Sequence, residues 1–452
     1  MKFSGQLPYI LTWDDLYLTP IYILLILLIV RKWRKRYADS PLKKYIYPAL
    51  LCRIFGCIFL ALMLNFYYGY GDTFSYFTGG REIWSAFIKH PKVAWEILTT
   101  DPQNYSSDAL EYALHSGYTG FASSYYVMFR AAGVIALFCF GTYLPIALVF
   151  TLLSFWGAWM IFLVFNERYP HLQKYIAITT LFIPSVIIWT TGILKEPLCM
   201  FGLGICFYTF NNILNGRKIK RSIIYFATGA LILLSVKNYI FYLFIAAACV
   251  WSYKSFVNHI TSSFIKLIIK GTIYLLFLIA IIYFFADNNN IVQTSFTDYF
   301  TKAAHLQTVM TTINIDYNSG SGYTLPINDL SGFGLITSFL LSLNVALFRP
   351  YIWECTNPLM VLNFIESFAT FLLVIFLLFK TGPVKIYRGL KDPVLLFSLL
   401  FSLMMAALVG FVSFNFGTLI RYKTPFEPFF YTMLVIILLN KIPIKASQIT
   451  LE

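Results

Sequence analysis

Long apolar runs alternate with short polar segments along most of the chain. Many of these runs reach the roughly 20 residues that a helix needs to cross about 30 Å of hydrocarbon, and they lack the alternation typical of a membrane β-barrel. Because lipid cannot satisfy open backbone groups, helices are the expected spanning elements. The pattern predicts one all-α polytopic membrane domain over residues 1–452, with about eleven transmembrane helices near 16–31, 45–65, 143–165, 173–190, 197–214, 222–236, 238–253, 264–285, 357–380, 393–414 and 425–440.

Composition supports a membrane protein and reduces the kinds of binding partner that are expected. The 452 residues are 59% hydrophobic and 12% charged, with a mean hydropathy of +0.71, which excludes an ordinary soluble domain. The net charge of +14 comes from short Lys/Arg clusters between apolar runs, so these clusters are read as topology signals and no nucleic-acid partner is expected. The seven cysteines lie mostly in apolar runs without metal-ligand spacing, and no metal site is predicted.

Basic clusters predict the orientation. They are expected on the cytoplasmic side and occupy residues 31–37, 215–221, 380–391 and 440–445. An even number of crossings must separate the first two clusters, so the apolar stretch 121–141 is predicted as a re-entrant or interfacial helix on the outer face. The stretch 333–348 is predicted in the same way, because a span there would upset the parity of the later crossings. The N-terminus is then outside and the C-terminus cytoplasmic, in a bacterial-type cytoplasmic membrane.

Two large loops, 66–121 with interfacial helices and 286–356 with a re-entrant helix, are predicted outside. The first begins with "YGYGDTFSYF", where Asp72 directly follows an apolar span. One interpretation makes Asp72 a general base that takes a proton from an acceptor hydroxyl, supported by Arg81 and Glu82. The alternative is a helix-cap or turn aspartate.

Two shorter outer turns place lysines at the predicted membrane surface. In "TTGILKEP", Lys195 is a candidate for binding a lipid phosphate, with Glu196 in support. The alternative is an adjacent ion pair that solvates a hairpin turn. Lys237 in "SVKNY" is a second candidate, and its alternative is a snorkelling lysine of the kind that commonly flanks spans.

Three later segments complete the candidate site. In "LFRPYIWE", Arg349 is a candidate for bidentate phosphate binding, supported by Glu354, and a purely structural pair of the two is the alternative. Arg421 in "FGTLIRYK" is a further phosphate candidate, with positional anchoring as its alternative. Glu366 lies inside a predicted span, where it is expected to contact a cation, a head group or a buried polar side chain.

Several common catalytic motifs are missing from the sequence. There is no Walker-type phosphate loop, no GxSxG elbow and no HExxH, and the five histidines form no ligand cluster. Their absence argues against an ATP-driven pump, a serine hydrolase and a zinc enzyme. What remains is a reaction that needs a base, cations and positioning, without a cofactor, although a divalent cation stays open as an alternative.

The segments "GDTFSYF", "TGILKE", "LFRPYIWE" and "FGTLIRYK" resemble polyprenyl-phosphate-dependent membrane glycosyltransferases of the GT-C type, and bacterial polysaccharide polymerases are similar at this level. The resemblance implies a donor sugar on an undecaprenyl-type phosphate, with Asp72 as base and Lys195, Arg349 and Arg421 at the phosphate. This chain departs from the pattern because Asp72 follows the second predicted span and has no adjacent second acid. It also lacks a clear Asp-x-Glu motif, so a metal-independent reaction is expected.

The expected function is therefore transfer of a sugar or oligosaccharide from a polyprenyl-(pyro)phosphate to a saccharide or glycoconjugate acceptor, at the outer face, for envelope polysaccharide assembly. Membrane lipids are the remaining expected partners. Two other classes stay open at this point. One is a transporter or flippase of an anionic lipid-linked saccharide, and the other is a non-catalytic membrane component of an envelope or secretion assembly.

Overall fold

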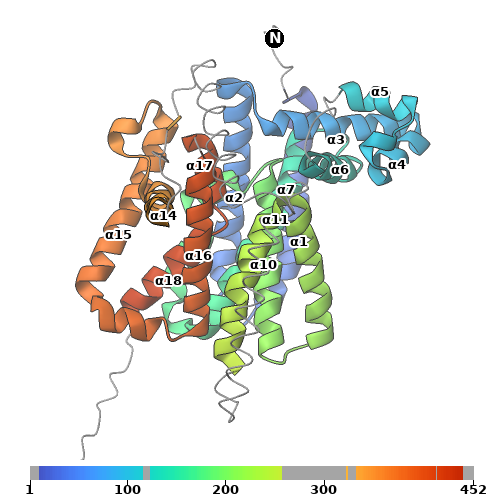
Figure 1. The fold of residues 1–452 in the computed structure, drawn as a ribbon. Coiled ribbons are helices and arrows are strands. Elements are labelled where there is room, and N and C mark those ends of the chain that lie inside the picture. Colours follow the sequence, from blue (N-terminus) through green and yellow to red (C-terminus); the bar gives the residue numbers. More distant parts are fainter. Residues whose placement is uncertain (1–9, 116–122, 257–321, 324–331, 414, 441–452) are drawn as a thin grey trace, which may run out of the picture. The chain divides into compact units, whose positions relative to one another are not determined.

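The computed structural model describes residues 10–115, 123–256, 322–323, 332–413 and 415–440 (Figure 1). The chain divides into two compact units. Unit 1 comprises Met1–Val164 with Leu181–Phe241, and unit 2 comprises Phe165–Thr180 with Tyr242–Glu452. The described secondary structure is helical apart from one isolated β-bridge, so the all-α prediction is confirmed for these residues.

Seven helices among the described residues are long and apolar enough to span a membrane: Trp13–Tyr37, Lys43–Tyr68, Tyr143–Arg168, Lys195–Leu214, Ile219–Tyr253, Met360–Gly389 and Pro393–Val412. A multi-span helical membrane protein is thus confirmed, whereas eleven spans are not. The predicted span 264–285 lies outside the described residues, and 425–440 corresponds to a helix of only 13 residues. The orientation, the kind of membrane and the non-spanning nature of 121–141 and 333–348 stay predictions.

The predicted span 173–190 is broken in the structure. Helix α8 covers Gln173–Leu181 and helix α9 covers Pro184–Trp189. The break precedes Pro184, which lacks a backbone N–H and disfavours helical geometry in the residue before it. Each piece is too short to cross a bilayer as a helix by itself.

Unit 1 contains the N-terminal helices and the predicted 66–121 loop. Its elements are α1 (Trp13–Arg34), η1 (Lys35–Tyr37), α2 (Lys43–Leu62), the π-helical turn η2 (Met63–Tyr68), α3 (Asp72–Lys89), α4 (Pro91–Thr99), η3 (Pro102–Asn104), α5 (Ser107–His115), α6 (Ser123–Ala136), most of α7 (Tyr143–Arg168), α9, α10 (Lys195–Leu214) and the first part of α11 (Ile219–Phe256). The described part of the predicted loop is therefore largely helical, and the interfacial position of its helices stays a prediction.

Helix α3 runs crosswise to α2 and packs along α6 (Figure 1). The chain turns between α2 and α3 at Gly71, whose φ of 132° is accessible to glycine and strained for other residues. Close packing then depends on Gly80, because a Cβ at that position would lie 2.7 Å from the Cβ of Ala132. These two glycines fix the direction of the helix that begins with Asp72.

Helix α11 is two helices joined at Lys237, whose φ of −147° and ψ of 82° are not helical. The rings of Phe226 and Phe241 lie 6.2 Å apart, whereas 15 residues of straight helix would separate them by about 22 Å. The chain therefore folds back at Lys237, and the predicted turn at 235–239 is confirmed.

Unit 2 holds the C-terminal helices. Its elements are η4 (Pro170–Leu172), α8, the remainder of α11, α14 (Gly332–Phe348), η6 (Ile352–Glu354), α15 (Pro358–Gly389), α16 (Pro393–Val412), α17 (Phe416–Lys423) and α18 (Glu427–Leu439). Stacked and edge-on aromatic rings form its core, including Phe397, Phe401 and Phe429. Helix α15 bends at Gly382, where φ is 70°.

Candidate functional site

Asp72 occupies the first turn of α3 and is half-buried. The hydroxyl of Tyr125, on α6, donates a long hydrogen bond of 3.4 Å to its Oδ1. A carboxylate is stabilised at this end of a helix by the partial positive charge of the unpaired backbone N–H groups. Gly71, not Asp72, is the N-cap of α3, and no side-chain capping bond is present, so the helix-cap alternative is not confirmed. The carboxylate lies next to the Tyr125 hydroxyl.

Lys195 begins α10 and reaches the same place. Its Nζ donates a 2.8 Å hydrogen bond to Ser124 Oγ and lies 4.3 Å from the centroid of the Tyr125 ring and 5.9 Å from that of Tyr76. Among the described residues no carboxylate forms an ion pair with Lys195. Its ammonium is held at short range by a hydroxyl and two aromatic faces.

Tyr125 therefore connects the two predicted residues: its hydroxyl contacts Asp72, and its ring lies under Lys195. Asp72 also attracts the Lys195 ammonium electrostatically at longer range. We call Asp72, Tyr76, Ser124, Tyr125 and Lys195 the Asp72–Lys195 site. It brings a carboxylate, a cation and aromatic surfaces together in unit 1.

Sequence reasoning did not assign Ser124 or Tyr125 to the site. Both belong to "SSYY" at the start of the apolar stretch predicted as an outer helix. The sequence feature that could indicate these site residues is the cluster of hydroxyl-bearing side chains at the beginning of the apolar stretch. What the sequence could not provide was the packing of α6 against α3 that directs them toward Asp72.

Glu196, the residue after Lys195, forms a buried ion pair with Lys237. Lys237 Nζ lies 2.9 Å from Glu196 Oε1, and the two side chains are 7% and 0% exposed. The predicted alternative, an ion pair between the neighbours Lys195 and Glu196, is wrong. Glu196 instead links the first turn of α10 to the fold-back in α11, and the Lys237 charge is balanced within the protein.

Arg81 and Glu82, the residues predicted to support Asp72, lie farther along α3. Arg81 is exposed and Glu82 is half-buried. The packed face of α3 carries Tyr76, Gly80 and Ile83 instead. The supporting roles of Arg81 and Glu82 stay predictions.

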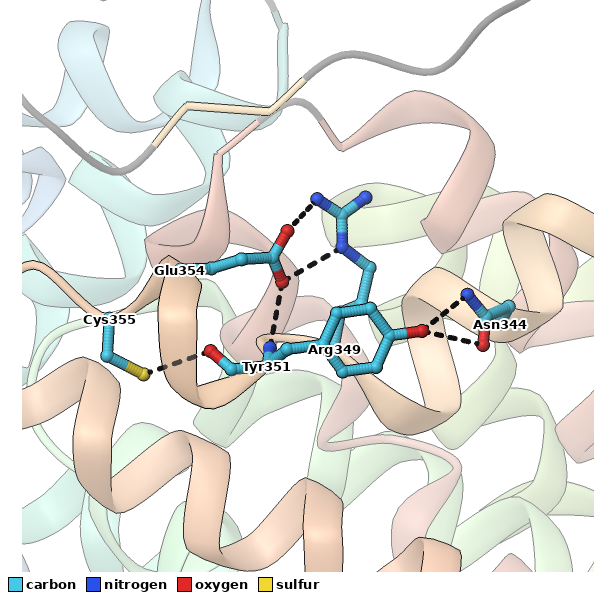
Figure 2. Close-up of polar contacts among 5 residues, drawn as sticks. All are labelled: Asn344, Arg349, Tyr351, Glu354 and Cys355. Carbon is cyan, nitrogen blue, oxygen red and sulfur yellow. Dashed lines mark hydrogen bonds and ion pairs between the residues drawn. The ribbon is translucent and has the colours of Figure 1, made fainter.

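In unit 2, Arg349 and Glu354 form a bidentate pair (Figure 2). Arg349 Nε lies 3.1 Å from Glu354 Oε2, and Arg349 Nη2 contacts Glu354 Oε1. The backbone N–H of Tyr351 also donates to Glu354 Oε2, at 2.8 Å. The structural pairing that the sequence left open is therefore present.

Aromatic rings hold the same guanidinium from other directions. Its central carbon lies 4.7 Å from the Tyr323 ring centroid and 5.3 Å from that of Phe416, and these two rings are 4.7 Å apart. Burial raises the pKa of the Tyr323 hydroxyl, so this hydroxyl remains neutral. Arg349 is thus anchored by a carboxylate and by rings at once.

Lys423 contacts the backbone of Arg349. It is 5% exposed, and its Nζ donates to the backbone oxygen of Arg349 and to Ser367 Oγ, each at 3.3 Å. Burial lowers the pKa of Lys423, against the attraction of Glu427 and Glu366. The burial of Lys423 and Glu427 is not apparent from the sequence.

The predicted site residues fall into two groups. Asp72, Lys195, Glu196 and Lys237 belong to unit 1, whereas Arg349, Glu354, half-buried Glu366 and half-buried Arg421 belong to unit 2. In the described part of the chain, no set of three His, Cys, Asp or Glu side chains could hold a metal ion.

The fold and the site define a class of protein, a multi-span all-helical membrane protein with a polar site at the starts of α3, α6 and α10. Comparison with protein-family models, with curated proteins and with solved structures finds no match.

Proposed function

We propose that this protein is a membrane glycosyltransferase that moves a sugar or oligosaccharide from a polyprenyl-(pyro)phosphate donor to a saccharide or glycoconjugate acceptor. The observation that carries the proposal is the convergence of Asp72 and Lys195 on Tyr125, at 3.4 Å from its hydroxyl and 4.3 Å from its ring centroid. Glycosyl transfer from a lipid phosphate needs a base for the acceptor and a cation for the leaving group. The site offers one of each.

Donor binding is assigned to Lys195. Its ammonium is held by Ser124 and two tyrosine rings, so a phosphate oxygen can approach it without displacing a protein carboxylate. Electrostatic attraction in a partly buried site exceeds that in water because the effective dielectric constant is lower. Tyr76 and Tyr125 supply flat surfaces on which a sugar ring can rest.

In the chemical step, an acceptor hydroxyl attacks the anomeric carbon of the donor sugar. The new carbon–oxygen bond forms as the bond from that carbon to the phosphate oxygen breaks. Asp72 takes the hydroxyl proton, and the bonding electrons leave with the phosphate, whose added negative charge Lys195 stabilises. No external oxidant or co-reactant is needed for this balance.

Two other cations receive different roles. Lys237 is a positioning residue, because its charge is balanced by Glu196 and it holds the first turn of α10, which carries Lys195. Arg349 is assigned a structural role in unit 2, since Glu354 occupies two of its nitrogens. Phosphate contact by Arg421 stays a prediction.

A transporter of an anionic lipid-linked saccharide is the second candidate. The observation that favours it is the buried, non-helical segment 190–194 ahead of α10, together with the break at Lys237. Discontinuous helices with buried irregular backbone are typical of transporter binding sites. A transporter has no need of a base, so Asp72 separates the two candidates.

The test uses the full-length protein in lipid vesicles with a polyprenyl-phosphate-linked sugar. Asp72→Asn should lower transfer by about 10²–10⁴-fold while donor binding is unchanged. Asp108→Asn, an exposed acid on α5, is the matched control and should transfer normally. Full transfer by Asp72→Asn contradicts the proposal. If the unmodified protein and Asp72→Asn both move the donor across the vesicle membrane without transferring its sugar, the transporter is favoured.

A further inference from the structure

Arg53 is a charged residue in the middle of a predicted membrane span. It lies on α2, about 15 Å along the helix from Lys43 and about 22 Å from Tyr68, the ends of the apolar helix. Its side chain is 0% exposed. An ionisable residue at such a depth is costly and commonly marks a functional site.

One nitrogen of Arg53 is well bonded. Nη1 donates to Ser154 Oγ at 2.8 Å and to Thr190 Oγ1 at 2.6 Å. These hydroxyls are partners without charge. Ser154 donates to Thr190 at 3.0 Å, and Thr190 donates to the backbone oxygen of Val186 at 2.6 Å. The two hydroxyls therefore remain hydrogen-bonded even without Arg53.

The other edge of the guanidinium differs in its hydrogen bonding. Nε and Nη2 are buried and have no hydrogen-bond partner among the described residues. Nor does any described carboxylate form an ion pair with Arg53. Arg349 in unit 2 shows how the same edge of a guanidinium pairs with a carboxylate. Its Nε and Nη2 contact the two oxygens of Glu354 (Figure 2).

Leaving these two nitrogens without partners is energetically costly, because a guanidinium remains charged even when buried. An unpaired buried charge costs several kcal/mol, and a bidentate oxyanion is the partner that best offsets this cost. The Arg53 edge has the spacing for two oxygens of one phosphate group. This edge of Arg53 is part of neither the Asp72–Lys195 site nor the Arg349–Glu354 pair.

We propose that the Nε and Nη2 edge of Arg53 is an anion site inside unit 1 that binds a phosphate group. Thr190 couples this site to the break in the helices, because it is the first residue of the buried irregular segment 190–194. Because Arg53 is 0% exposed, an anion can reach this edge only if the surrounding segments move apart. The inference does not depend on glycosyl transfer and holds equally for a transporter.

The test measures the thermal unfolding midpoint of the full-length protein in detergent. Inorganic phosphate should raise the midpoint by at least about 2 °C over sodium chloride at equal ionic strength, and Arg53→Met should abolish this shift. Arg53→Lys, which keeps the charge but lacks the two-nitrogen edge, should retain only part of it.

Arg130→Met is the matched control. Arg130 is an arginine of unit 1 whose Nε and Nη2 already donate to the backbone oxygens of Ile97 and Thr100. Its phosphate shift should equal that of the unmodified protein. A shift that survives in Arg53→Met, or that is lost equally in Arg130→Met, overturns the assignment.

A second probe, farnesyl phosphate, distinguishes a lipid-borne phosphate from a free one. Equal shifts with both probes at matched concentration indicate a site for free phosphate. A shift with farnesyl phosphate alone, still dependent on Arg53, indicates a lipid-linked phosphate. If neither probe stabilises the unmodified protein more than Arg53→Met, the edge is not an anion site.

Discussion

Arg349 in unit 2 is held differently from Lys195 and Arg53 in unit 1. In unit 2, Arg349 contacts both oxygens of Glu354 and is packed against aromatic rings. In unit 1, Lys195 and Arg53 are hydrogen-bonded to hydroxyl groups, and no described carboxylate forms an ion pair with either. A cation neutralised by the protein stabilises the fold, whereas a cation held by neutral groups is available to an external anion. By this criterion Lys195 and Arg53 are candidates for binding an external anion.

The largest stability effect is expected at a cation that is fully neutralised. Lys237→Met leaves Glu196 charged and buried, so the free energy of unfolding should fall by about 3–5 kcal/mol. Denaturation of the full chain in detergent measures this loss. The double variant Lys237→Met with Glu196→Gln should recover most of it. A single-variant loss below about 1 kcal/mol would show that the pair contributes little to the fold.

A smaller loss is expected at Arg349, because its side chain and that of Glu354 remain 15% and 16% exposed. Arg349→Met should lower the free energy of unfolding by about 2–3 kcal/mol. The same denaturation experiment with Glu354→Gln and with the double variant gives the coupling energy between the two residues. Additive losses would mean that the pair is not a stabilising contact.

Arg53 should respond in the opposite direction. Without added phosphate, Arg53→Met removes an unpaired buried charge and leaves Ser154 and Thr190 bonded to their other partners. The free energy of unfolding should therefore rise by about 1–2 kcal/mol. Denaturation in phosphate-free buffer checks this sign. A loss as large as that of Arg349→Met would make Arg53 a structural residue.

The smallest stability change is expected at Lys195. Its partners are one hydroxyl and two tyrosine rings, and such contacts contribute about 1 kcal/mol or less at partly exposed positions. Lys195→Met should change the free energy of unfolding by no more than this amount. A loss comparable to that at Lys237 would assign Lys195 to the fold rather than to a ligand.

Much of the helical architecture follows from local sequence pattern. Apolar runs are sufficient to predict helices such as α1, α2, α7 and α16, and the polar "SVKNY" predicts the fold-back at Lys237. The broken span 173–190 was missed because its mean hydropathy is that of a span, although Pro184 within it signals a break.

Charge pairing was much less predictable. Lys195 and Glu196 are adjacent in sequence, but neighbouring residues on a helix point in different directions, and Glu196 pairs with Lys237 instead. That partner is determined by the packing of α10 against the break in α11. Arg53 was missed because a single charge barely lowers the hydropathy of the run 45–65, and only the folded chain reveals an edge without a partner.

The central claim is that Lys195 is available to bind the donor phosphate, and its most direct test is donor binding by the full-length protein. Binding of a polyprenyl-phosphate-linked sugar should weaken at least about tenfold in Lys195→Met, a loss of about 1.4 kcal/mol, and only partly in Lys195→Arg. Lys89→Met, at an exposed lysine ending α3, should bind as the unmodified protein does. Unchanged donor binding by a folded Lys195→Met protein would contradict the claim.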